Sequence, residues 1–264
     1  LMLVFAAITP HSPLLLPTVG KEHQKKLKKT LAAYKTLEEN LQTSKSDTLV
    51  VISPHGTALP ETFPLFIAAH YTTDLKEFGD LTTKLKVKSD LRTIASLRRL
   101  RLAPSPMTIT GITDEFLDYG VAVPLSFLLP RLTGTSIVPL GVSSLLLSAH
   151  EEIGRHIGDV LQQSKRRIAV VASADLAHTL TDAAPGGFSP EGKKFDQAVV
   201  HAFRKDDRKK ILTLEQMAET VKSCGLRPIA ILFGILDGIN CTPTILSYEG
   251  PFGVGHLVVQ FNFR

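Results

Sequence analysis

The sequence predicts an α/β protein in which a central, mostly parallel or mixed sheet lies between two layers of helices. Two apolar runs, residues 49–52 and 168–172, are typical of strands that are buried on both faces. Segments with the 3–4 spacing of amphipathic helices alternate with such runs along the chain. No linker-like or low-complexity segment interrupts the 264 residues, so we predict a single domain that spans residues 1–264.

The individual elements follow from local patterns. Strands are expected at residues 4–9, 47–55, 63–69, 81–87, 136–142 and 167–173, and two more flank the segment 247–256. Helices are expected at residues 21–42, 90–102, 148–163, 190–203, 214–223 and 227–236, and a short apolar helix ends at Leu129. Asp90 and Ser148 are the expected N-caps of two of these helices, because their side chains can accept hydrogen bonds from free backbone amides.

Composition excludes several classes of protein. Hydrophobic residues make up 44% of the chain and charged residues 21%, which is ordinary for a globular protein, and no apolar run approaches the length of a membrane span. Two cysteines do not make a disulfide framework, and the N-terminus has no signal-peptide pattern, so we expect a cytoplasmic protein without membrane partners. The net charge of +5 comes without a recognition motif or interleaved aromatics, which argues against nucleic-acid binding.

Four chemically active side chains fall just after predicted strands. They are His11, His55, His178 and Glu249, and Glu249 lies in a turn rich in glycine and proline. In open α/β sheets, ligands gather beyond the carboxyl ends of the strands, so we expect these residues to converge. Two histidines and one carboxylate form the ligand set of a non-haem Fe(II) site, with Mn(II) and Zn(II) as alternatives. His178, with an ordinary pKa near 6.5, could then act as acid and base.

Each of these residues also has a purely structural interpretation. His11 could cap a turn, Glu249 could be a solvated carboxylate, and His178 could be an ordinary residue at the start of a helix. Cys224 is most simply a small buried apolar residue. The remaining histidines were expected on the surface or on helix faces, and His256 in a strand; none of these is assigned a role, and they are His23, His70, His150, His156, His201 and His256.

Seven short segments, in order along nearly the whole chain, resemble the class III extradiol ring-cleavage dioxygenases, the superfamily of the protocatechuate 4,5-dioxygenase catalytic subunit. The nearest resemblance within it is to the dioxygenase-like domain of AmmeMemoRadiSam-system proteins, which is related to the Memo proteins. The segments are Thr9-Pro10-His11-Ser12-Pro13, Ser53-Pro54-His55-Gly56, Leu117-Asp118-Tyr119-Gly120 with Val123-Pro124-Leu125, Ala172-Ser173-Ala174-Asp175-Leu176-Ala177-His178, Phe188-Ser189-Pro190-Glu191-Gly192, Cys224-Gly225-Leu226-Arg227 and Tyr248-Glu249-Gly250-Pro251-Phe252-Gly253.

The resemblance implies a metal site and its surroundings. His11, His55 and Glu249 would bind Fe(II), and His178 would be the acid and base beside it. Ser12, Tyr119, Cys224 and Arg227 are the expected substrate-contacting positions.

Two further comparisons with the family bear on the reaction. Tyr119 stands where members of the group often have histidine; a phenol is a poor acid and base at neutral pH, which puts catechol turnover in doubt. In the Memo branch a cysteine takes the place of the carboxylate ligand, so Glu249 favours the dioxygenase side.

Three hypotheses follow for the function. The first is an extradiol dioxygenase that cleaves a catecholic ring with O₂, its substrates being an aromatic diol and O₂. The second is a metal-binding module without oxygenase activity, of the Memo or AmmeMemoRadiSam type, acting with a partner protein of that system. The third and weakest is a Zn(II) hydrolase that uses the same three residues to activate water. A homodimer is compatible with the resemblance, although no sequence feature indicates an interface.

Overall fold

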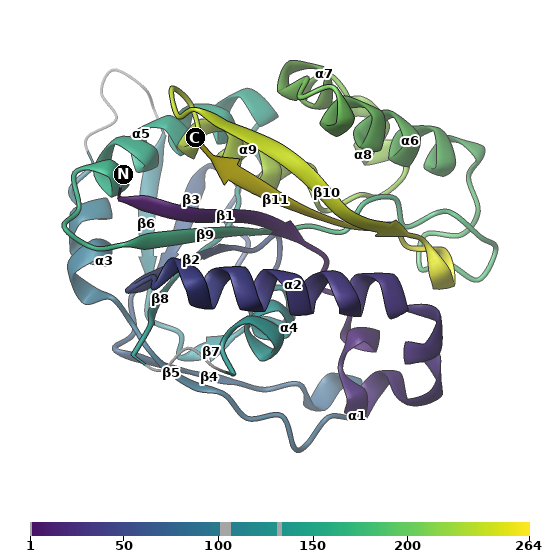
Figure 1. The fold of residues 1–264 in the computed structure, drawn as a ribbon, viewed down its shortest axis with the longest axis horizontal. Coiled ribbons are helices and arrows are strands. Elements are labelled where there is room, and N and C mark those ends of the chain that lie inside the picture. The colour runs from purple at the N-terminus through teal and green to yellow at the C-terminus, as the bar shows by residue number, and fades with distance from the viewer. Residues whose placement is uncertain (1, 101–106, 131–133) are drawn as a thin grey trace.

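The structure is a computed structural model that describes residues 2–100, 107–130 and 134–264. Its centre is a mixed eight-stranded sheet with the strand order β10-β11-β1-β9-β2-β8-β3-β6 (Figure 1). The strands are β1 (Leu3–Thr9), β2 (Thr48–Ile52), β3 (Thr62–Phe66), β6 (Thr108–Ile112), β8 (Ser136–Leu140), β9 (Ile168–Ser173), β10 (Cys241–Glu249) and β11 (His256–Phe263). A small second sheet pairs β5 (Lys86–Lys88), β4 (His70–Thr73) and β7 (Phe116–Leu117).

Helices connect and cover these strands. The α-helices are α1 (Pro17–Gly20), α2 (Lys28–Ser44), α3 (Leu91–Leu97), α4 (Tyr119–Leu128), α5 (Leu147–Gln162), α6 (Pro190–Arg204), α7 (Arg208–Leu212), α8 (Glu215–Thr220) and α9 (Leu226–Ile235). Short 3₁₀ helices lie at Pro13–Leu15, Lys21–Lys26, Lys76–Phe78 and Pro251–Gly253. Among the described residues, no helix is both long enough and apolar enough to cross a membrane.

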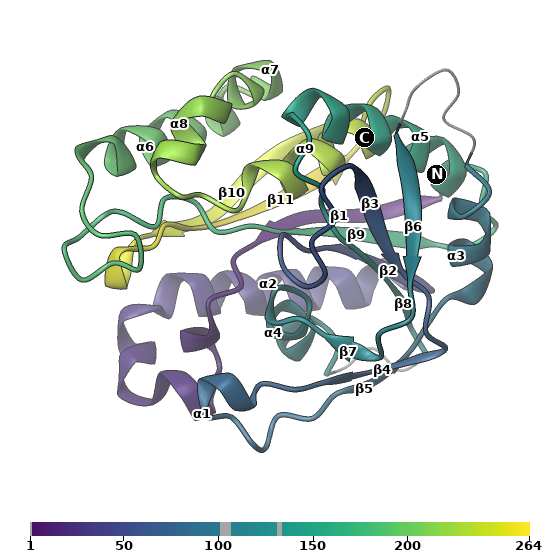
Figure 2. The ribbon, with the colours of Figure 1, turned by 180° about the vertical axis from the view of Figure 1, so that it is seen from behind.

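The two faces of the large sheet carry two separate cores. On one face, Tyr34 and Leu37 of α2 and Val121 of α4 pack against Val51 and Val171 of the strands. On the other face, residues of α3, α5, α6 and α9 pack against alternate residues of the same strands, such as Val50 and Val170. Figures 1 and 2 show α2 and α4 on one side of the strands and α5 and α9 on the other. The expected three-layer α/β architecture is therefore confirmed.

Most of the predicted elements are present, with differences at their ends. Asp90 caps α3 as expected, its side chain accepting from the amides of Arg92 and Thr93. The backbone of Leu146 rather than Ser148 begins α5, and α2 begins seven residues later than predicted because a 3₁₀ segment precedes it. The expected strand at residues 81–87 is reduced to β5, whereas β4, β6, β7 and α7 were not predicted. The end of the helix expected at residues 90–102 lies partly outside the described residues.

Three parallel strands determine where the site lies. β1 and β2 both pair with β9 in parallel, so the three strands end at the same edge of the sheet. The segments that carry His11, His55 and His178 leave the sheet at this edge, one after each of these strands. Because parallel pairing brings the carboxyl ends together, residues separated by more than a hundred positions meet there.

Candidate metal centre

Two histidines from neighbouring strand ends meet at the carboxyl edge of the sheet. Nε2 of His11 lies 3.0 Å from Nε2 of His55, and the two rings meet edge to face. Two bare imidazole lone pairs at this separation would repel, so a proton or a cation must lie between the nitrogens. Burial lowers the pKa of both rings, that of His55 to about 3, and the neutral imidazole is the form that binds a metal.

The third potential ligand is Cys224, which precedes α9. Its Sγ lies 3.5 Å from Nε2 of His11, and the donor atoms of His11, His55 and Cys224 all lie within 4.8 Å of one another. Of the residues that the structure describes, these three form the group suited to holding a metal ion. Burial raises the pKa of the Cys224 thiol, so the group is a neutral thiol until a cation stabilises the thiolate.

The loop that carries Cys224 is held tightly against the end of β9. Ser223 Oγ donates a hydrogen bond of 3.1 Å to the carbonyl of Asp175. A Cβ at Gly225 would lie 2.7 Å from the same carbonyl oxygen, so only glycine permits this approach. The thiol of Cys224 is thereby fixed beside His11, although the two residues are 213 positions apart.

Glu249 does not join this group. Its Oε1 accepts hydrogen bonds from the backbone amide of Thr30 at 2.8 Å and from the Thr30 hydroxyl at 2.7 Å, which ties the end of β10 to the first turn of α2. In this structure the carboxylate of Glu249 contacts Thr30, while the loop before α9 brings the thiol of Cys224 to the two histidines. The assignment of Glu249 as the third metal ligand stays a prediction.

Hydrogen-bond partners on the Nδ1 side orient the two imidazoles. Nδ1 of His11 lies 2.8 Å from Oγ of the buried Ser173, and Nδ1 of His55 lies 3.2 Å from the phenol oxygen of Tyr119. When each Nδ1–H donates to its hydroxyl partner, both Nε2 atoms present lone pairs toward the centre. The tyrosine ring also stacks on His55, with ring centroids 4.2 Å apart. Tyr119 therefore positions a ligand, a role beyond the substrate contact expected from the sequence.

The turn that carries His55 depends on a small hydrogen-bonded network. Ser53 Oγ accepts from the amide of His55 at 3.1 Å and donates to Oδ1 of Asp118 at 2.6 Å. Asp118 also caps α4 by accepting from the amide of Val121. A Cβ at Gly120 would lie 2.4 Å from Ser53 Oγ, which explains the glycine in the Asp-Tyr-Gly segment. The network fixes His55 and Tyr119 relative to each other.

Asp175 is a buried carboxylate beside His11. Its Oδ1 accepts from the backbone amide of His11 at 3.1 Å, and its Oδ2 lies 3.5 Å from Nε2 of the same residue. Burial alone would raise the pKa of Asp175, but the neighbouring histidines and the His11 amide bring it below its ordinary value. The carboxylate therefore supplies negative charge next to a cation bound between the histidines. This contact joins residues 164 positions apart, so no local pattern of the sequence indicates it.

His178 lies at the margin of the same cluster. Its Nε2 is 3.8 Å from Sγ of Cys224, and burial lowers its pKa, so the ring is a neutral base near pH 7. The backbone around it is fixed by Asp196, whose Oδ1 accepts from the amide of Ala177 at 2.9 Å. Asp196 also accepts from the Tyr248 hydroxyl at 2.7 Å. His178 is thus held where a molecule bound at the two histidines and the cysteine could meet it.

The other expected substrate-binding residues differ in their positions. Ser12 begins the 3₁₀ helix at Pro13–Leu15, and its carbonyl accepts from the amide of Leu15. Arg227 shares with Cys224 the lining of a small cavity of about 30 Å³, and its buried Nε has no hydrogen-bond partner among the described residues. Among the described residues, neither side chain hydrogen-bonds to the histidine pair, so their role in substrate binding stays a prediction.

A match to a protein-family model covers nearly the whole chain. Residues 5–259 match the family model described as the catalytic LigB subunit of aromatic ring-opening dioxygenase. The chain belongs to the LigB family. The fold is similar to that of an uncharacterized protein of Escherichia coli K12, JW3007, whose crystal structure superimposes with a TM-score of 0.63 at 18% identity over 97% of this chain and 99% of that one. At that identity the likeness concerns the fold alone.

A curated relative is the protein CA_C1420 of Clostridium acetobutylicum. It is 28% identical over 264 residues, which cover 96% of this chain and 56% of the relative. The chain therefore spans about half the length of the curated relative that it matches. Neither the name of this relative nor that of the Escherichia coli protein states an activity, so the LigB family match is the functional information that the comparisons supply.

Proposed function

We propose that this LigB-family chain is a metal-binding protein in which His11, His55 and Cys224 hold a thiophilic transition metal, as in the Memo type. The observation that carries the proposal is the position of Cys224, with Sγ 3.5 Å from His11 Nε2. Two imidazoles and a thiolate suit Zn(II), copper and Fe(II), whereas Mn(II) prefers oxygen ligands. In this proposal the cysteine takes the place of the carboxylate that the sequence predicts as the third ligand.

The donor set fits such a metal. The paired Nε2 atoms are 3.0 Å apart and need a cation or proton between them. The half-buried thiol of Cys224 beside them becomes a strong ligand when a cation stabilises its thiolate. Asp175 adds a carboxylate 3.5 Å from His11 Nε2, which offsets the positive charge of the ion. Ser173 and Tyr119 orient the imidazoles through their Nδ1 atoms, as the hydrogen-bond partners of metal-binding histidines do in general.

Metal analysis of protein purified without added metal tests the proposal. We expect about one transition-metal ion per chain, and loss of at least about tenfold in metal affinity in the variant Cys224→Ala. Cys241→Ala is the matched control, because Cys241 is the other cysteine of the chain and contacts Arg208 in a different part of the fold. If Cys224→Ala keeps its metal and Glu249→Ala loses it, the proposal is wrong and the carboxylate is the ligand after all.

Extradiol ring cleavage is a second candidate, favoured by the family match and by the place of His178. A bound metal would supply the electronic path between a diol and O₂. The chain's own residues would do the rest: the neutral imidazole of His178 would take the proton of a substrate hydroxyl at Nε2 and return it later to a leaving oxygen. Tyr119 would donate a hydrogen bond at the edge of the site, since burial raises its pKa and keeps the phenol protonated.

Oxygen uptake separates the two candidates. Protein loaded anaerobically with Fe(II) is mixed with catechol, 3,4-dihydroxybenzoate or a bicyclic diol, and O₂ consumption and yellow ring-opened products are followed. Ring cleavage that His178→Gln abolishes while metal content stays unchanged would establish the dioxygenase. Stoichiometric metal without turnover of any diol supports the metal-binding role, and capture of a partner protein by the metal-loaded chain would then identify the system in which it acts.

A further inference from the structure

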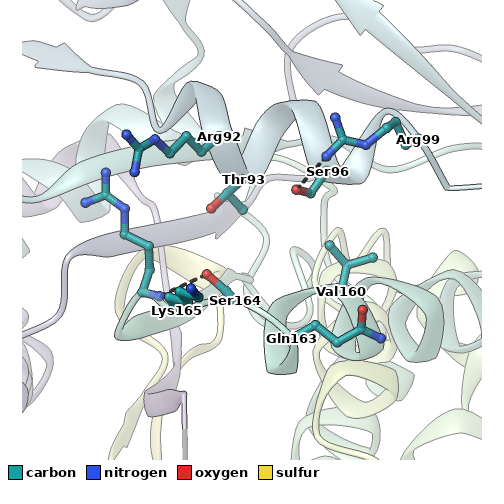
Figure 3. Close-up of a pocket in the computed structure, with 9 residues that line it drawn as sticks. Arg92, Thr93, Ser96, Arg99, Val160, Gln163, Ser164 and Lys165 are labelled. Carbon is teal, nitrogen blue, oxygen red and sulfur yellow. Dashed lines mark hydrogen bonds between the residues drawn. The ribbon is translucent and has the colours of Figure 1, made fainter.

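A cationic hollow lies far from the histidine cluster, between the end of α5 and the helix α3. Its volume is about 590 Å³, within the range of small-molecule sites. Figure 3 shows the side chains of Arg92 on α3 and of Arg99 in the turn just after it, and those of Gln163 and Lys165 on the other wall. Arg166 completes the lining with a fourth cation.

The location separates this hollow from the candidate metal centre. Asp90, which caps α3, receives a hydrogen bond from Thr48 at the start of β2, and its amide donates to the carbonyl of Ile137 at the start of β8. Residues 163–166 lead directly into β9, which begins at Ile168. The hollow is therefore at the amino ends of the parallel strands, whereas the histidines follow their carboxyl ends.

The positive charge of the hollow is weakly compensated. Among the described residues, no carboxylate forms an ion pair with Arg92, Arg99 or Lys165, and Arg166 pairs with the buried Asp90, 3.7 Å from its Nε. Asp90 already accepts from the amides of Arg92 and Thr93 and from the hydroxyls of Thr48 and Thr93, which occupy its oxygens. Four cations thus face one carboxylate that is largely engaged elsewhere.

The remaining lining is polar and small. Hydroxyls of Thr93, Ser96 and Ser164 and the amide of Gln163 stand among the cations, and Val160 is the apolar contribution. Arg99 is held by a hydrogen bond of 3.3 Å from Nη2 to Ser96 Oγ, which keeps its guanidinium near the hollow. Among the described residues, no aromatic side chain lines the hollow, so a nucleobase would have no stacking surface there. Guanidinium groups match phosphate oxygens in geometry as well as in charge.

We propose that this hollow binds a small polyanion that carries linked phosphate groups, recognised by Arg92, Arg99, Lys165 and Arg166. Two phosphates joined as a pyrophosphate present several oxygens at once and can meet cations from both walls. Recognition is of the phosphates, because the lining offers charge and hydroxyl donors and no aromatic platform. The site is independent of the metal centre and stands whatever chemistry that centre performs.

Calorimetric titration of the whole chain with inorganic pyrophosphate tests the proposal. At an ionic strength of about 0.15 M, where long-range attraction is screened beyond roughly 8 Å, we expect saturable one-site binding. The double variant Arg92→Ala/Arg99→Ala should weaken binding by about tenfold or more, because it removes two charge-assisted contacts. The matched control is Lys193→Ala/Arg204→Ala, which removes the same charge from exposed positions on α6.

Every outcome of these titrations either supports or overturns the proposed phosphate site. Saturable binding that the α3 variant weakens and the α6 variant leaves unchanged supports the site. Absence of binding overturns it, and so does equal weakening by both variants, which would show attraction by net charge alone. A single-stranded oligonucleotide that binds more tightly than pyrophosphate through the same arginines would also overturn it, because the occupant would then be a nucleic-acid backbone. Circular dichroism of the variants verifies that each one is folded.

Discussion

Sγ of Cys224 lies 3.5 Å from Nε2 of His11, although 213 positions separate the two residues in the chain. The contact exists because the loop before α9 packs on the carbonyl of Asp175, at the end of the strand that pairs with β1. It converts a pair of histidines into a site with a soft, ionisable third donor. A LigB-family fold can therefore offer a metal a thiolate, and the preference of the site moves toward metals that bind sulfur.

Glu249 is expected to contribute to stability and not to metal binding. Removing its carboxylate in Glu249→Ala leaves the amide and the hydroxyl of Thr30 without their acceptor. Because an unsatisfied partly buried donor costs about 1–3 kcal/mol, the free energy of unfolding should fall by roughly that amount. Urea denaturation measures the loss, and metal analysis should show unchanged stoichiometry. Thr30→Ser, which keeps both donors, is the control, and loss of metal from Glu249→Ala would contradict the expectation.

Ser173→Ala should weaken metal binding without removing a ligand. Oγ of Ser173 lies 2.8 Å from Nδ1 of His11 and selects the tautomer that leaves Nε2 free for the ion. Outer contacts of this kind are worth about 10–100-fold in metal affinity. Competition with a chelator of known affinity measures the change. The matched control is Ser247→Ala, since that buried hydroxyl has no hydrogen-bond partner among the described residues; equal effects of the two variants would argue against an orienting role for Ser173.

The variant Tyr119→Phe removes the hydroxyl of the tyrosine and keeps its ring, so it tests the two contributions separately. The ring stacks on His55 and should hold the imidazole in place, while the lost hydroxyl removes the partner of Nδ1 at 3.2 Å. We expect metal affinity to fall by about tenfold, with the fold retained. Tyr119→Leu, which removes the ring as well, should cause a larger loss. Isothermal titration with Zn(II) compares the variants, and equal affinity of Tyr119→Phe and the unchanged protein would show that the hydroxyl does not orient His55.

His150 should make the protein less stable in acid. Its ring is fully buried, with Nδ1 2.9 Å from the carbonyl of Leu146 and Nε2 3.3 Å from the amide of Ser143, and burial lowers its pKa to about 4. The unfolded chain takes up the proton near pH 6.5, so the stabilising contribution is present above that pH. It is lost as the pH falls toward 4, and its upper bound is about 3 kcal/mol.

The measurement is urea denaturation at several pH values between about 4 and 7. His150→Gln should be less stable at neutral pH but should lose less stability on acidification than the unchanged protein. His201→Gln, at an exposed position of α6, serves as the control and should follow the unchanged protein. Parallel curves for His150→Gln and the unchanged protein would show that this histidine does not carry the acid sensitivity.

Local patterns in the sequence predicted much of the fold. Continuous apolar runs become β2 and β9, which are buried on both faces, and the 3–4 spacing of apolar residues becomes α2, α5 and α6. Elements with weak patterns were missed, such as β4 and β7, because their strands are short and partly exposed. His150 was expected at the surface or on a helix face, and it lies on the buried face of α5. The sequence alone does not show which face of a helix is covered by its packing partner.

Local features of the sequence indicated that His11, His55 and His178 follow strands whose ends lie at one edge of the sheet, because strand ends are local patterns and parallel pairing brings them together. Long-range packing, which no local pattern reports, places Cys224 and not Glu249 beside the two histidines. Cys224 and Glu249 both lie near the end of a helix or strand, and no local sequence pattern predicts which of the two side chains reaches the histidines. That choice depends on long-range packing: Thr30 of α2 engages Glu249, while Gly225 lets the loop of Cys224 approach Asp175.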